Sequence, residues 1–194
     1  MSKKELSSDK KKTKRKQGFG AAVKEMLIII AMAVAIAAVI KLFLFDTRII
    51  PTTSMTPTIS VNDRIVMSRL SYAFGSVPER GDIVVFTAPE ELSMKDDLVK
   101  RVIGLPGDTI EIKDGLVYIN GEPYAEDYLL EPPYYYMEPL TVPEGCYFML
   151  GDNRNGSNDG HLWSEKFVPL DDIKGKALFC YWPLSRFGSL QSEE

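Results

Sequence analysis

The sequence predicts a mostly β domain that follows one N-terminal transmembrane helix. Three observations lead to this prediction: a basic N-terminal segment, a long apolar run behind it, and short strand-like runs separated by turn residues from residue 46 onward. The length of 194 residues allows one compact domain of ordinary size once the first two segments are set aside. Two domains of normal size would not fit.

The first 24 residues are strongly basic. They hold nine Lys and Arg residues against Glu5 and Asp9, a net charge of +7, so the rest of the chain carries −11 within a total of −4. A segment of this composition cannot bury enough apolar surface to fold, and we expect residues 1–24 to be a disordered cytoplasmic tail. Nucleic-acid binding is the alternative for such a lysine run, but the apolar segment that follows favours a membrane-related tail.

The run from Met26 to Phe45 has 20 residues and one charge, Lys41. About 20 helical residues at ~1.5 Å each match a hydrocarbon core of ~30 Å, so we expect a transmembrane helix at residues 25–45. Lysines ahead of the first span keep the N-terminus in the cytoplasm, which predicts a single-pass protein of the cytoplasmic membrane with its β domain outside. A cleavable signal is disfavoured because residues 46–51 lack a small-x-small cleavage site.

From Asp46 onward, apolar or alternating runs are separated by Gly, Pro, Asn and Asp, which is typical of β-strands joined by tight turns. The clearest hairpin has Asp114-Gly115 as its two-residue turn, and Asn120-Gly121 supplies a second turn close behind. Residues 122–144 are rich in Pro and Tyr and predict an irregular or ribbon-like excursion. The candidate strands are 63–69, 81–86, 98–104, 109–113, 116–120, 147–151 and 174–182.

The composition gives little support to a metal or cofactor. There is one histidine, His161, and the two cysteines, Cys146 and Cys180, lie far apart, so a zinc site is not expected. No glycine-rich loop opens a helix to hold a phosphate, and we expect no cofactor. On the outer side of the membrane the cysteines could form a disulfide or remain buried thiols, and their number leaves both open.

Ser54 and Lys100 are the candidate catalytic residues. A serine hydroxyl is a weak nucleophile until a base takes its proton, and a lysine can be that base if its amine is neutral. Lysine titrates near ~10.4 in water, and burial in apolar surroundings lowers that pKa. The neighbours of Lys100 predict a buried strand, although spacing alone favours an exposed edge-strand lysine and an ordinary loop serine.

Four segments of the chain resemble, in order, the sequence boxes of bacterial type I signal peptidases. They are residues 51–58 (PTTSMTPT), 81–86 (GDIVVF), 99–108 (VKRVIGLPGD) and 151–159 (GDNRNGSND). The resemblance covers about residues 26–187. It implies coiled antiparallel β-sheets that form a catalytic domain at 46–187, with a β-ribbon insertion at about 111–144 and a short tail at 188–194.

The resemblance also implies the activity and the site. The protein would be a membrane-bound serine endopeptidase that removes signal peptides from exported preproteins, beside the lipid bilayer and the protein export machinery, without nucleic acid or metal. Ser54 matches the nucleophile and Lys100 the general base. Ser157 matches the hydroxyl that orients the lysine, and Thr52 matches the side-chain donor that joins the Ser54 N–H in the oxyanion hole. Met55 matches a residue that packs near the nucleophile.

The chain departs from the family pattern after the fourth box. Where the family usually has Asp-Ser-Arg, this sequence has Asp159-Gly160-His161. The arginine that usually pairs with the aspartate is therefore missing, which leaves Asp159 to pair with His161, with Arg154 or with no residue.

Other charged positions and other functions remain open. Arg101, Asp152 and Asp159 match charged positions near the site, and we expect them to be structural. His161 allows a Ser-His-Asp arrangement, which is disfavoured because Lys100 lies in its full motif. Two different functions are a non-catalytic, membrane-anchored β-domain that binds exported chains and a Ser-Lys hydrolase with another substrate.

Overall fold

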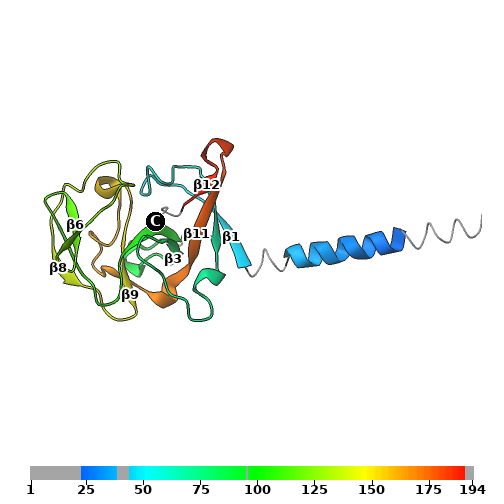
Figure 1. Ribbon diagram of the computed structural model, residues 1–194, viewed down its shortest axis with the longest axis horizontal. Helices are drawn as coiled ribbons and strands as arrows, with labels where there is room; N and C mark the ends of the chain where they lie inside the picture. The colour runs from blue at the N-terminus through cyan, green and yellow to red at the C-terminus, as the bar shows by residue number, and fades with distance from the viewer. Residues whose placement is uncertain (1–22, 39–43, 95, 191–194) are drawn as a thin grey trace, which may run out of the picture. The chain divides into compact units, whose positions relative to one another are not determined.

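The structure, a computed structural model, describes residues 23–38, 44–94 and 96–190 (Figure 1). The chain divides into two compact units, Met1–Phe43 and Leu44–Glu194, and residues 23–38 of the first unit form a helix. Within the described residues, no helix is both long enough and apolar enough to cross a membrane. The span predicted at 25–45 includes residues 39–43, which lie outside the described residues, as does most of the tail predicted at 1–24.

The second unit contains two antiparallel sheets, which confirms the prediction of a mostly β fold. The larger sheet has the strand order β1 (Phe45–Ile49), β2 (Arg64–Ser68), β11 (Ile173–Trp182), β3 (Ile83–Phe86), β4 (Leu98–Gly104), β9 (Cys146–Leu150) and β10 (Phe167–Pro169), and β12 (Gly188–Ser189) pairs with β11. The smaller sheet has the order β7 (Glu122–Tyr124), β6 (Leu116–Ile119), β5 (Thr109–Lys113) and β8 (Met137–Thr141). Figure 1 shows β6 and β8 at the opposite end of this unit from β11 and β12.

Short 3₁₀ helices connect several of these strands. They are η2 (Leu70–Tyr72), η3 (Glu90–Leu92), η4 (Arg154–Gly156), η5 (Leu170–Asp172) and η6 (Leu184–Arg186). Residues 151–153 separate η4 from the end of β9, and these residues and η4 belong to the fourth sequence box, so that box leaves the sheet through a short turn.

The turns of the smaller sheet follow from its sequence. Asp114 and Gly115 have φ angles of 51° and 75°, and Asn120 and Gly121 have φ angles of 54° and 88°. Two successive positive φ angles make the two-residue turn whose twist matches antiparallel strands, and Asn, Asp and Gly adopt them most easily. Both predicted turns are confirmed, and seven predicted strands lie within two residues of observed ones.

Five short strands were not predicted: β1, β7, β8, β10 and β12. Three of them contain proline, Pro123 in β7, Pro139 in β8 and Pro169 at the end of β10, and a residue without an N–H argues against a central strand. The strand order places β7 and β8 at the two ends of the smaller sheet, where proline is tolerated.

The two ends of the predicted domain also differ from expectation. Phe45, taken as the last residue of the span, begins β1. Residues 188–190 do not form a tail, because β12 pairs with β11 and the side chain of Leu190 is buried in the core. The remainder of the predicted tail, 191–194, lies outside the described residues.

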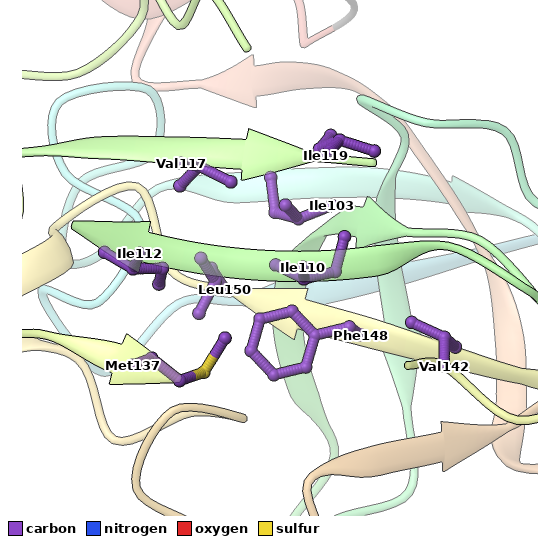
Figure 2. Close-up of a cluster of buried hydrophobic side chains, with 9 residues drawn as sticks. All are labelled: Ile103, Ile110, Ile112, Val117, Ile119, Met137, Val142, Phe148 and Leu150. Atoms are coloured by element: carbon purple, nitrogen blue, oxygen red, sulfur yellow. The ribbon is translucent and has the colours of Figure 1, made fainter. Parts of the chain in front are cut away.

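One apolar cluster joins the two sheets, as Figure 2 shows. Side chains from β4 and β9 of the larger sheet meet side chains from β5, β6 and β8 of the smaller sheet. The members drawn are Ile103, Ile110, Ile112, Val117, Ile119, Met137, Val142, Phe148 and Leu150. Because the cluster is shared, the smaller sheet is packed against the strands that lead to the functional site and is not an independent appendage.

We expect Ile110→Ala to destabilise the β domain by about 2–5 kcal/mol, because it removes buried methyl and methylene groups and leaves a cavity between the sheets. Ile49→Ala is the matched control: Ile49 is 61% exposed and Ile110 is 1% exposed. Urea unfolding of the full chain, followed by tryptophan fluorescence, measures both changes. Equal loss of stability in the two variants would contradict the shared core.

Candidate active site

Ser54 lies in the loop between β1 and β2, and buried apolar residues hold this loop. Ile50, Met55 and Ile59 pack into a core cluster that also contains residues of β2, β3 and β11. The Ile59 N–H donates to the Met55 carbonyl at 2.9 Å, which closes a turn directly after the serine. Met55 is therefore an anchor of the loop, and Ser54 beside it is only 9% exposed.

Lys100 lies in the middle of a central strand. Its strand, β4, is paired with β3 on one side and β9 on the other, and Lys100 is opposite Val84. The residue is 3% exposed, so the alternative of an edge-strand lysine facing water is wrong. No hydrogen bond or ion pair from the described residues reaches its ammonium group. Burial lowers the pKa of Lys100 to about 8, although the negative charges of Asp159 and Asp152 act in the opposite direction.

Gly151 is the point where Ser54 and Ser157 come together. A Cβ atom placed on Gly151 would overlap with the Ser157 Oγ and with the Ser54 carbonyl oxygen. Arg101 pairs with Leu150 in the antiparallel β4–β9 register, so continuing that register by one residue places Gly151 across from Lys100. Cross-strand partners project toward the same face of a sheet. The side chain of Lys100 is thereby directed toward the space that the two serines border.

Hydroxyl groups cluster on the Ser54 side of this space. The Thr52 Oγ1 and Ser54 Oγ are 3.3 Å apart, within hydrogen-bond distance. The Ser157 Oγ is buried and has no hydrogen-bond partner among the described residues. The Asn153 N–H donates to the Ser54 carbonyl at 3.1 Å, and the Asn153 side chain donates to the Thr53 carbonyl at 3.2 Å, which ties the fourth sequence box to the serine loop.

A buried ion pair connects the strand of Lys100 to the same loop. Arg101 donates to both oxygens of Asp152, from Nε at 2.9 Å and from Nη2 at 2.6 Å. The Thr58 hydroxyl donates to one of these oxygens at 2.5 Å. Arg101 and Asp152 were expected to be structural, and these contacts place them between the serine loop and the lysine strand without contact to Ser54.

Asp159 is fully buried, and its two oxygens have separate partners. One accepts the Gly151 N–H at 2.8 Å, and the other lies 2.6 Å from His161 Nδ1. Of the partners left open by the sequence, His161 is therefore the one that Asp159 contacts. No hydrogen bond among the described residues links His161 to Ser54, so the geometry does not assemble a Ser-His-Asp triad.

Three contacts from the segment 126–135 could not be predicted. Glu126 accepts from Arg154 Nη1 at 2.6 Å and from Nη2 at 2.5 Å, the Tyr128 ring lies 3.9 Å from the Arg101 guanidinium carbon, and the Tyr135 ring stacks on His161 at 3.9 Å. The tyrosine-rich composition was visible, but no pattern in the sequence indicates which residues these side chains meet.

The sequence left open whether the two cysteines form a disulfide. Both Cys146 and Cys180 are free thiols. The alternatives were a disulfide and two buried thiols; the thiols are unpaired, but only Cys180 is buried, and Cys146 is partly exposed.

Comparison with known proteins assigns the chain to a family. The model of the family described as signal peptidase, peptidase S26, matches residues 23–182. A probable signal peptidase I-1 of Synechocystis sp. is 44% identical over 88% of this chain and 88% of its own length. A signal peptidase I of Leptolyngbya laminosa is 43% identical over 83% of this chain and 80% of its own length, and one of Bacillus caldolyticus is 38% identical over 80% and 90%. Because the family model spans most of the chain and these relatives align over nearly their full lengths, the protein belongs to the signal peptidase family, peptidase S26.

Proposed function

We propose that this protein removes N-terminal signal peptides from exported preproteins as a serine endopeptidase, with Ser54 as the nucleophile and Lys100 as the general base. The family membership and the relatives named signal peptidase I support the activity. The observation that carries the mechanism is the burial of Lys100 in a central strand, opposite the glycine around which Ser54 and Ser157 come together.

The proposed reaction has two proton-transfer cycles on Lys100. In the first, the neutral amine takes the proton of Ser54 Oγ while the oxygen attacks the scissile carbonyl carbon, and the resulting ammonium gives that proton to the leaving nitrogen as the C–N bond breaks. In the second, the amine takes a proton from water, which attacks the acyl-enzyme ester. The ammonium then returns the proton to Ser54 Oγ, and the carboxylate product leaves.

Two hydroxyls and one backbone group assist this chemistry in the proposal. The Thr52 Oγ1, next to Ser54 Oγ, and the Ser54 N–H would donate to the oxyanion that develops on the carbonyl oxygen. The Ser157 Oγ lacks a partner among the described residues, and it borders the space that Lys100 faces. A hydrogen bond from Lys100 to Ser157 would satisfy both buried groups and orient the amine.

The membrane arrangement is also a proposal. Residues 25–45 would anchor the protein, residues 1–24 would lie in the cytoplasm, and residues 46–187 would form the extracytoplasmic peptidase domain next to the export machinery. The lysine-rich start and the apolar run that follows support this arrangement. An enzyme held in the bilayer meets signal peptides that lie in the same bilayer, so anchoring would contribute to positioning the scissile bond.

We expect Ser54→Ala and Lys100→Met to lower kcat/KM for a purified preprotein by at least ~10³-fold, because each removes a group that acts in every turnover. Methionine keeps the length of the lysine stem in its buried site. Ser76→Ala and Lys174→Ala are matched controls at exposed positions. Mass spectrometry of the products identifies the cut. Full activity in either active-site variant would exclude the dyad, and a wild type that cuts no preprotein would favour a non-catalytic binding domain.

We expect kcat/KM to rise with pH through a midpoint near the pKa of about 8 for Lys100, because only its neutral form accepts the serine proton. Below that pH the lysine is protonated and activity falls about tenfold per pH unit. The measurement is a series of initial rates from about pH 6 to about pH 10 in detergent. A midpoint near the ordinary histidine value of ~6.5 would instead implicate His161.

We expect Gly151→Ala to lower kcat by ~10²-fold or more, because the added methyl would displace Ser157 or the Ser54 backbone and misplace the reacting groups. Gly188→Ala is the matched control, since a Cβ there meets no atom within 4 Å and the φ angle is ordinary. Steady-state kinetics and circular dichroism of both variants test this expectation. Retention of wild-type kcat in Gly151→Ala would mean that the groups around it do not take part.

A further inference from the structure

His161 is connected to both proposed catalytic residues by a short series of contacts. Its Nδ1 lies 2.6 Å from one oxygen of Asp159, and the other oxygen accepts the Gly151 N–H at 2.8 Å. Gly151 in turn borders Ser54 and lies across from Lys100. His161 thus lies two residues after the fourth box in sequence, and the Asp159 carboxylate connects it to the backbone of Gly151.

The contact between His161 Nδ1 and Asp159 determines which nitrogen of the imidazole carries a proton. A carboxylate can only accept hydrogen bonds, so His161 Nδ1 carries the proton and donates it toward Asp159. The contact needs only the proton on Nδ1, whereas a guanidinium at this position would always bring a full positive charge to the carboxylate. Asp159 is fully buried, and water therefore screens the charge of its carboxylate little.

Asp159 differs from the other acidic groups around the site because it is not paired with an arginine. Asp152 is paired with the guanidinium of Arg101, and Glu126 is paired with that of Arg154. Among the described residues, Asp159 has no lysine or arginine within ion-pair distance, and its one partner with a titratable side chain is His161. Its negative charge therefore acts on Lys100 with less compensation than the others, and it raises the pKa of Lys100 against the larger opposite effect of burial.

Other groups face this pair from the elements packed against it. The Tyr135 ring stacks on the imidazole at 3.9 Å with an interplanar angle of 10°, which fixes the ring plane. Asp159 raises the pKa of the Tyr135 hydroxyl in addition to the larger effect of burial, while Arg154 lowers it. Lys166 Nζ donates to the His161 carbonyl at 3.0 Å and does not contact Asp159.

We propose that His161 is a positioning residue for the reaction: it holds Asp159 in place while leaving the charge of that carboxylate to act on Lys100. This role rests on the proposed function of Lys100 as the general base. Asp159 then makes Lys100 hold its proton more strongly than it would beside a permanently charged residue at position 161. An arginine there would compensate the carboxylate, and Lys100 would become neutral at a lower pH.

The test compares a substitution that places a permanent charge at position 161 with one that supplies an uncharged donor. His161→Arg introduces a permanent cation, and His161→Asn places an amide donor near the position of Nδ1. Leu162→Arg is the matched control, because it adds the same charge one residue away on a side chain that is 63% exposed. Each variant is made in the full chain and measured as kcat/KM against pH in detergent.

We expect His161→Arg to move the midpoint of the pH profile down by about 0.5–1 unit and to raise kcat/KM at pH 7 by ~3- to 5-fold. His161→Asn and Leu162→Arg should keep the wild-type midpoint. If arginine prevents folding beside Tyr135, His161→Lys supplies the same charge and carries the same expectation.

A second readout does not depend on catalysis. In full-length Ser54→Ala, the titration of the Lys100 amine is followed by nitrogen NMR with and without His161→Arg. A lower Lys100 pKa in the arginine variant supports the inference even if no preprotein is cut, which would count against the proposed function alone. If wild type cuts preprotein but neither readout distinguishes His161→Arg from Leu162→Arg, the inference is wrong and the proposed function stands.

Discussion

The buried ion pair between Arg101 and Asp152 connects the strand of the proposed base to the loop of the proposed nucleophile. Arg101 follows Lys100 in β4, Asp152 follows Gly151 after β9, and Thr58 of the serine loop donates to the same carboxylate. A buried pair contributes little net stability because both ions lose their hydration, but removing one partner leaves an uncompensated charge. The pair therefore fixes a geometry more than it stabilises the fold: Ser54 and Lys100 keep their places because Asp152 binds to both segments.

The smaller sheet is part of the same arrangement. In the loop between β7 and β8, Glu126 accepts hydrogen bonds from Arg154. In the same loop, the Tyr128 ring packs on Arg101 and the Tyr135 ring stacks on His161. Arg154 also donates to the Gly151 carbonyl at 3.1 Å, so the loop supports the glycine around which the two serines come together. The apolar cluster between the sheets holds this loop against β4 and β9, because Tyr135 packs on that cluster. The residues that surround the proposed site thus come from both sheets.

Local patterns predicted much of this fold because the forces behind them are local. Asp114-Gly115 specifies its hairpin through positive φ angles, and the apolar neighbours of Lys100 predict a buried strand before its partners are known. Pairings between distant segments have no such signature. The bond between Glu126 and Arg154 spans 28 residues, and the choice of His161 as the partner of Asp159 depends on how the fourth box turns after β9. The prolines of β7 and β8 misled the prediction because their strands end a sheet, which only the topology reveals.

Those two prolines also bear on what the smaller sheet can attract. A sheet edge with free N–H and carbonyl groups is a template for any extended chain. Pro123 and Pro139 remove donors from the end strands of this sheet, and Glu122 and Glu138 add charge beside them. Extended chains that reach the protein therefore meet edges with fewer backbone donors and with added negative charge. Edges of this kind leave such chains fewer places to pair, and this reduces competition with the serine loop.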